Sequence, residues 1–112
     1  RLLHPARRYM QLRFEAPQEH RVQEAAVVLA ATAAALPSSA WKGRVVLELG
    51  CGAAFVGVTL AAIGAQVVLT DLPALETVAT GSIALNARAI KSPGSARFCA
   101  LDWARPRASP AA

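Results

Sequence analysis

Three short segments of the chain contain apolar residues in succession, and turn-forming residues bound each of them. They cover residues 44–49, 66–70 and 96–101. Apolar residues that run together, rather than alternating with polar ones, are typical of strands buried on both faces. We therefore expect three strands, and we expect the first two to be buried on both faces.

Segments rich in helix-forming residues precede and separate these strands. They predict helices over three ranges: 18–36, 53–63 and 74–90. Pro37 ends the first helix, Gly64 ends the second, and Pro73 suits the first turn of the third. The first helix is so apolar from Ala25 onward that we expect it to be buried against a large surface. One stripe of the third helix is expected to face the core: Leu75, Val78, Ser82, Leu85 and Ala89.

The alternation of strands and helices with short connections predicts an α/β domain with a Rossmann-like topology. Right-handed crossovers place three parallel strands side by side, with the first strand at one edge. An open apolar edge invites aggregation, so we expect further chain to cover this strand and complete the sheet. The start at Arg1 rather than at Met agrees with that expectation.

The two ends of the chain differ in composition from its middle. The formal net charge is +5, and residues 1–21 carry five arginines against two glutamates. Alternating side chains over residues 9–14 predict a short strand within this basic segment. Residues 22–103 carry the α/β pattern. The Pro-, Ala- and Arg-rich residues 104–112 are predicted to be a disordered tail.

Composition also disfavours several classes of protein. The apolar segment 25–36 is shorter than the ~20 residues that span a bilayer, so no membrane segment is predicted. The basic ends lack interleaved aromatic side chains, so we expect them to be solvated and do not expect nucleic acid as a partner. Cys51 and Cys99 have no metal-binding spacing and fall on different predicted elements. They indicate free thiols, a cytoplasmic protein and no metal site.

The most informative motif is the glycine turn Gly50-Cys51-Gly52, which directly follows the first predicted strand. In open α/β sheets, ligands bind beyond the carboxyl ends of the strands. Glycine at such a position lets the backbone turn sharply and approach a ligand closely. The succession of strand, turn and helix therefore indicates a nucleoside-containing cofactor.

Glu48, two residues before the turn, helps to choose that cofactor. A carboxylate on a buried strand needs a hydrogen-bond donor or a cation beside it. The pyrophosphate of a dinucleotide would be repelled by this charge, whereas S-adenosylmethionine has no phosphate and carries an ammonium and a sulfonium. We therefore expect S-adenosylmethionine. An alternative, compatible with the first, is that Glu48 accepts hydrogen bonds from loop amides.

Two further strand ends carry side chains suited to a nucleoside. Asp71 lies 19 residues after Gly52 and offers two acceptor oxygens to ribose hydroxyls; the alternative is a helix N-cap. Asp102 and Trp103 end the third strand. The indole is expected to pack on adenine, and the carboxylate to accept from the adenine amino group. The alternative for Trp103 is a side chain that closes the edge of the core.

Three motifs resemble those of class I, or seven-stranded, S-adenosylmethionine-dependent methyltransferases. They are Val-Leu-Glu-Leu-Gly-Cys-Gly at 46–52, Val-Leu-Thr-Asp-Leu-Pro at 68–73 and Ala-Leu-Asp-Trp at 100–103. Within this superfamily, the chain is most similar to the methyltransferase-like protein-lysine methyltransferases, over about residues 22–103. The resemblance implies the cofactor-binding half of a Rossmann-like methyltransferase fold and a protein substrate methylated on lysine.

The same resemblance implies roles for individual residues. Gly50, Cys51 and Gly52 are expected to contact the methionine part of the cofactor. Asp71, with Leu72 beside it, is expected to hold the ribose, and Trp103 to flank the adenine.

Two positions depart from the pattern of the family. Residues 22–26, Val-Gln-Glu-Ala-Ala, resemble the group's Val-Trp-Asp-Ala-Ala, in which the tryptophan also touches the cofactor. Gln23 can still form a hydrogen bond there, but the lost ring is expected to weaken binding. Ala53 and Ala54 stand where Thr-Gly is usual, so the turn must accommodate a Cβ at position 54. Gly57 keeps close contact between helix and sheet possible.

No catalytic residue is predicted in this chain. The acid-x-x-aromatic motif with which the family grips its substrate is expected beyond Ala112, and His4 and His20 are expected at the surface. Two other functions are compatible with the fold. One is a non-catalytic, methyltransferase-like module that binds cofactor weakly or mediates an interaction. The other is a nicotinamide dinucleotide enzyme, which Glu48 and Ala54 disfavour.

Overall fold

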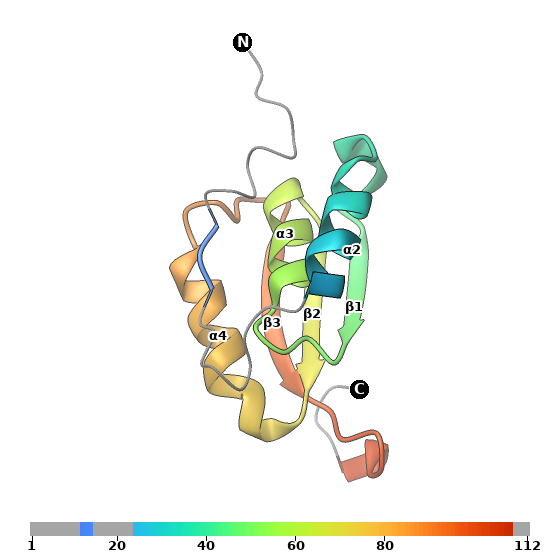
Figure 1. Cartoon of the computed structure of the whole chain (residues 1–112), viewed down its shortest axis with the longest axis vertical. Helices are drawn as coiled ribbons and strands as arrows, with labels where there is room; N and C mark the ends of the chain where they lie inside the picture. The colour runs from blue at the N-terminus through green and yellow to red at the C-terminus, as the bar shows by residue number, and fades with distance from the viewer. Residues whose placement is uncertain (1–11, 15–23, 109–112) are drawn as a thin grey trace.

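The computed structural model describes residues 12–14 and 24–108 of the chain. Its centre is a parallel sheet of three strands: β1 (Val45–Leu49), β2 (Gln66–Asp71) and β3 (Ser95–Ala100). The strands lie in the order β1-β2-β3, so β1 is at one edge (Figure 1). Each strand lies within one residue of its predicted bounds. The expected incomplete Rossmann-like α/β sheet is confirmed.

Within the described residues, three α-helices flank the sheet: α2 (Glu24–Ala34), α3 (Phe55–Ile63) and α4 (Glu76–Leu85). α3 lies over the middle of one face, with α2 packed on it towards β1 and α4 beside it towards β3 (Figure 1). Gly64 ends α3 in the left-handed conformation with φ 118°, as its position predicted. The part of the first predicted helix before Glu24 lies outside the described residues.

The helix predicted over 74–90 is shorter than expected, and its predicted core stripe is confirmed at Leu75 and Ser82 but not at Leu85 and Ala89. Pro73 opens a short 3-10 turn, η4 (Pro73–Leu75), before α4 begins. The buried positions are Leu75, Ala79, Ser82 and Asn86. Val78 is half-buried, while Leu85 and Ala89 are exposed. The small side chains of Ala79 and Ser82 allow the helix to lie close to its neighbours, so they occupy the inner face in place of Leu85.

The hydrophobic core lies between the sheet and α3. Val58, Ala61 and Leu69 are completely buried there. Gly57 allows the close contact of α3 with β2, because a Cβ at this position would overlap the side chain of Leu69. The close contact of helix and sheet at this glycine is as expected.

The opposite face of the sheet is covered by none of the three described helices. Val45, Leu47 and Leu49 alternate on that face and are 76%, 58% and 55% exposed. The prediction that β1 is buried on both faces is therefore wrong for this chain, because α2, α3 and α4 all pack on the other side.

α2 is also less buried than its composition predicted. Ala30 and Ala34 are buried, while Val27, Val28 and Leu29 are exposed. The reason is that α2 packs mainly on α3 and not on the sheet, so a single side of it is covered.

The described parts of the two ends also differ from the predictions. Residues 12–14 form no strand, because the backbone of Arg13 bonds to the side chain of Asn86 instead of to a neighbouring strand. Residues 9–11 of that predicted strand lie outside the described residues. At the other end, residues 104–108 include a 3-10 turn, η5 (Pro106–Ala108), where a disordered tail was predicted. In the described ranges, no helix has the length and apolarity needed to cross a membrane.

Candidate functional site

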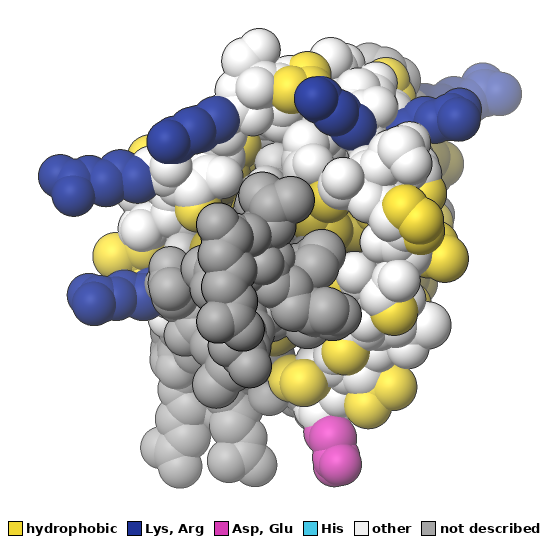
Figure 2. Space-filling model, turned by 90° about the horizontal axis from the view of Figure 1, so that it is seen from above, with side chains coloured by type: hydrophobic (Ala, Val, Ile, Leu, Met, Phe, Trp, Pro, Cys, Tyr) yellow, Lys and Arg dark blue, Asp and Glu magenta, His cyan; other side chains and the backbone are white. Residues whose placement is uncertain are grey.

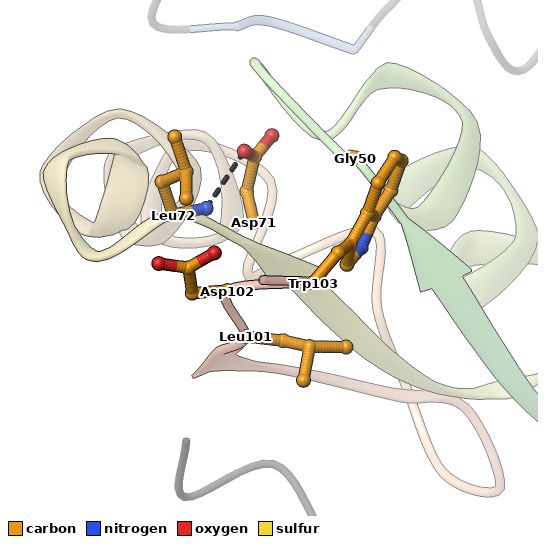
Figure 3. Close-up of a pocket in the computed structure, with 6 residues that line it drawn as sticks. All are labelled: Gly50, Asp71, Leu72, Leu101, Asp102 and Trp103. Atoms are coloured by element: carbon orange, nitrogen blue, oxygen red, sulfur yellow. Dashed lines mark hydrogen bonds between the residues drawn. The ribbon is translucent and has the colours of Figure 1, made fainter. Parts of the chain in front are cut away.

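The carboxyl ends of the three strands surround a cavity of about 230 Å³ (Figure 3). Six residues line it: Gly50, Asp71, Leu72, Leu101, Asp102 and Trp103. Five of these six were predicted as cofactor-binding residues. Leu101 was not predicted, although its position directly before Asp102 marks it as part of the same strand end. The cavity forms because parallel strands in register finish at one edge of the sheet.

The glycine turn after β1 is held by hydrogen bonds to the end of β2. Gly50 and Gly52 have φ values of 70° and 53°, which favour glycine. The amide of Cys51 donates to the carbonyl of Thr70 at 2.9 Å, and the amide of Gly52 donates to Asp71 Oδ2 at 2.9 Å. The turn is thus attached to the neighbouring strand end at two consecutive residues.

Asp71 connects this turn to the wall of the cavity. Its Oδ2 accepts from Gly52, and its Oδ1 accepts from the amide of Leu72 at 2.7 Å. Each carboxylate oxygen has two lone pairs, so each keeps one acceptor site for a ligand. The alternative interpretation of Asp71 as a helix N-cap is wrong, because the residue at the N-cap of η4 is Leu72.

Trp103 forms the side of the cavity next to the glycine turn. Its indole lies beside Gly50, with Cζ2 3.9 Å from the position that a Cβ of Gly50 would occupy (Figure 3). The side chain is 67% exposed, so it does not close the edge of the core as the alternative required. An exposed indole beside a glycine turn offers a flat apolar surface to a ring. Asp102 Oδ1, on the same loop, accepts from the amide of Ala104 at 2.9 Å.

Glu48 does not line this cavity but points towards the start of α3. Its Oε1 accepts a hydrogen bond from the amide of Gly57 at 3.0 Å. Gly57 lies in α3, so the partner is a helix amide and not a loop amide as the alternative predicted. The pKa of Glu48 is raised to about 7, mainly by burial of the carboxyl and to a smaller extent by the charge of Asp71, against the opposing effect of the bond from Gly57. A carboxylate at this position also faces the positive end of the α3 dipole.

Cys51 is buried in the glycine turn, where its thiol is disfavoured as a thiolate. Burial, together with the charges of Glu48 and Asp71, raises the pKa of Cys51 to about 12. Cys51 and Cys99 are both free cysteines, as predicted. Among the described residues, no three His, Cys, Asp or Glu side chains are grouped closely enough to hold a metal ion. The last predicted site residue, Gln23, lies outside the described ranges.

Ala54, which follows the glycine turn, has an unusual backbone conformation for alanine. It has φ 68°, is completely buried and is the N-cap of α3. Its amide donates to the carbonyl of Cys51 at 2.7 Å, which closes the turn before the helix begins. The turn thus accommodates a Cβ at position 54, as predicted, but in a left-handed conformation that is strained for alanine.

Acidic side chains gather near the carboxyl ends of the strands, and two arginines, Arg105 and Arg107, also follow β3 there. Glu48, Asp71 and Asp102 all lie at the carboxyl ends, around the cavity and the glycine turn. On the face seen in Figure 2, most of the charged side chains of the described residues are Lys and Arg. No basic side chain lines the cavity. A lining with two carboxylates and no basic side chain suits a cationic ligand better than a pyrophosphate.

Comparisons with known proteins agree with this geometry. A family model described as lysine methyltransferase matches residues 18–110. EEF1A lysine methyltransferase 3 of Mus musculus is 44% identical over 64 residues, which are 56% of this chain and 26% of that protein. EEF1A lysine methyltransferase 3 of Xenopus tropicalis is 35% identical over 63 residues, 56% of this chain and 27% of that protein. The similarity thus spans about a quarter of each relative. Because the family match covers most of the 112 residues, the chain belongs to the lysine methyltransferase family.

Proposed function

We propose that this chain carries the S-adenosylmethionine site of a protein-lysine methyltransferase. One observation supports the proposal above all others: three adjacent strand ends surround a single cavity with a glycine turn, a carboxylate and an exposed indole. These are the groups that the methionine, ribose and adenine parts of the cofactor require. All of them lie within the range that matches the family.

The described residues fit this cofactor in three ways. Asp71 keeps a free lone pair on each oxygen for the ribose hydroxyls. Trp103 offers the face of its ring to adenine, and Asp102 an acceptor for the adenine amino group. The turn at Gly50 leaves space for the methionine part, because no Cβ projects from it. When bound, the cofactor supplies an activated methyl group, while these residues bind and orient it.

The substrate is inferred from the relatives. Both are named as lysine methyltransferases of EEF1A, so we infer a protein lysine as the methyl acceptor. We assign no catalytic role to any described residue, because a deprotonated lysine attacks the methyl group directly and the protein mainly positions the two partners. We further infer a cytoplasmic protein from the two free thiols; microscopy of the tagged gene product tests this location.

Isothermal titration of the chain with S-adenosylmethionine tests the proposal. We expect binding at one site, and no binding of NADH to the same protein. Trp103→Ala is expected to weaken binding by about tenfold or more, since stacking on a base contributes about 1–3 kcal/mol. Trp103→Phe keeps a ring and is expected to retain most of the affinity. A folded chain that gives no heat with S-adenosylmethionine contradicts the proposal.

One observation favours a second function, a non-catalytic module that binds the cofactor weakly. Ala54 places a strained residue in the turn where the family pattern has glycine. Methyl transfer to lysine-containing protein, measured with radiolabelled cofactor on the full-length gene product, separates the two functions. Binding without transfer supports the module, whereas transfer supports the enzyme.

A further inference from the structure

Residues 12–14 are attached to the domain by a buried asparagine 73 positions away. Asn86 follows α4 and is 4% exposed. The amide of Arg13 donates to Asn86 Oδ1 at 2.8 Å, and Asn86 Nδ2 donates to the carbonyl of Arg13. Nδ2 also donates to the carbonyl of Ser82 at 2.7 Å, which fixes the side chain on its own helix. The side-chain amide of Asn86 therefore forms hydrogen bonds with both the N–H and the C=O of Arg13, as the backbone of a neighbouring strand would.

The next residue, Phe14, contacts α3, the helix that follows the glycine turn. Its ring centroid is 4.9 Å from that of Phe55, with 44° between the ring planes. Phe55 is the first residue of α3 and directly follows Ala54. Residues 12–14 thus run from the end of α4 to the start of α3 (Figure 1). Leu12 and Phe14 are half-buried against the core, while Arg13 is exposed.

We infer that Asn86 and Phe14 are positioning residues for the cofactor site, an inference that rests on the proposed function. Asn86 fixes the backbone of Arg13, and this directs the ring of Phe14 onto Phe55. Phe55 in turn holds the end of the segment that begins at Gly50. Neither Asn86 nor Phe14 lines the cavity, so both act on the cofactor through the glycine turn.

The energetics of a buried amide agree with this role. A buried polar side chain is destabilising unless its donors and acceptors are paired, and Asn86 has partners for both its oxygen and its nitrogen. If Asn86 is truncated, the amide and carbonyl of Arg13 lose these partners, and residues 12–14 lose their attachment to α4. The ring of Phe14 is then no longer directed at Phe55, and the glycine turn moves more freely.

The test combines cofactor affinity with a control for stability. Asn86→Ala and Phe14→Ala are each expected to weaken S-adenosylmethionine binding by about fivefold at a temperature where the protein is folded. The double variant is expected to bind no more weakly than either single variant, because both changes break the same contact chain. Val67→Ala destabilises the core in β2 and is expected to leave the affinity unchanged. Equal weakening by Val67→Ala, or full affinity in Asn86→Ala, overturns the inference.

Hydrogen exchange gives a second readout that does not depend on the cofactor. Asn86→Ala is expected to speed amide exchange both in residues 12–14 and in residues 50–55, whereas Val67→Ala does not single out these two segments. Unchanged exchange in residues 50–55 overturns the inference even if the wild-type chain binds no cofactor, an outcome that would count against the proposed function alone. If Asn86→Ala does not fold, Phe14→Ala replaces it. This variant leaves the hydrogen bonds of Asn86 in place and removes the ring contact with Phe55, so faster exchange in residues 50–55 is still expected.

Discussion

Asp71 Oδ2 accepts a hydrogen bond from the amide of Gly52 at 2.9 Å, although 19 residues separate the two. The bond joins the end of β2 to the turn that follows β1. One carboxylate therefore shapes the glycine turn and presents its remaining lone pairs to the cavity. The cofactor site and the local fold depend on the same side chain.

Replacement of Asp71 by alanine is expected to abolish most cofactor binding. The variant loses two charge-assisted acceptors for the ribose and releases the amide of Gly52, so the affinity is expected to fall by at least about tenfold. Titration calorimetry with S-adenosylmethionine measures the change. Glu76→Ala, which removes an exposed acid at the start of α4 outside the cavity, is the matched control and should bind as the wild type does. Comparable losses in the two variants would mean that net charge, and not the position of Asp71, governs binding.

Replacement of Ala54 by glycine is expected to stabilise the domain. Glycine removes the strain of φ 68°, which is worth about 1 kcal/mol or more, and this exceeds the small loss from removing one buried methyl group. Ala53→Gly is the control, because Ala53 is also buried but is not among the residues with positive φ. Urea unfolding should show a higher midpoint for Ala54→Gly and a lower one for Ala53→Gly. A lower midpoint for both would show that the lost methyl group outweighs the strain.

The sheet and the position of the site were predictable because they depend on local pattern and on topology. Apolar residues in succession located β1 and β2, and the shared edge of parallel strands brought Asp71 and Trp103 to one cavity. The exposure of Leu47 was not predictable. An apolar pattern shows that a strand suits burial, but not whether another element covers it.

The hydrogen-bond partners of individual polar side chains could not be predicted from the sequence either. Glu48 accepts from Gly57 in α3, whereas the sequence led us to expect a cation or loop amides as its partner. Asn86 was read as part of a longer helix. Asn86 and Arg13 are 73 residues apart, and no local sequence pattern predicts their contact.

Two buried threonines provide a test of hydrogen-bond energetics. Within the described ranges, Thr59 Oγ1 is buried with no hydrogen-bond partner, whereas Thr70 Oγ1 donates to the carbonyl of Glu48 at 2.6 Å. Thr59→Val keeps the shape and removes an unpaired polar atom, so it is expected to stabilise the domain by about 1 kcal/mol. Thr70→Val removes a paired donor and is expected to destabilise it by a similar amount. Chemical unfolding of the two variants checks the opposite signs, and equal signs would contradict the assignment.

Glu48 is expected to make the stability of the domain depend on pH. Its folded-state pKa of about 7 lies above the ordinary value of 4.5, so the folded state binds the carboxyl proton more tightly than the unfolded state does. The resulting stabilisation is fully present below about pH 4.5 and is lost as the pH rises through 7. Glu48→Gln keeps an oxygen for the amide of Gly57 and carries no charge. It is therefore expected to be more stable than the wild type at pH 8, by on the order of 2 kcal/mol, and equally stable at pH 4.5.

Urea unfolding of wild type and Glu48→Gln at both pH values measures this difference, with Glu76→Gln as the control. Glu76 is exposed at the start of α4, so its neutralisation should change the free energy of unfolding little at either pH. The comparison is made between variants at each pH because other carboxylates also titrate over this range and would obscure a single curve. A Glu48→Gln variant less stable than the wild type at pH 8 would mean that the charge on Glu48 stabilises the start of α3 by more than its burial opposes it.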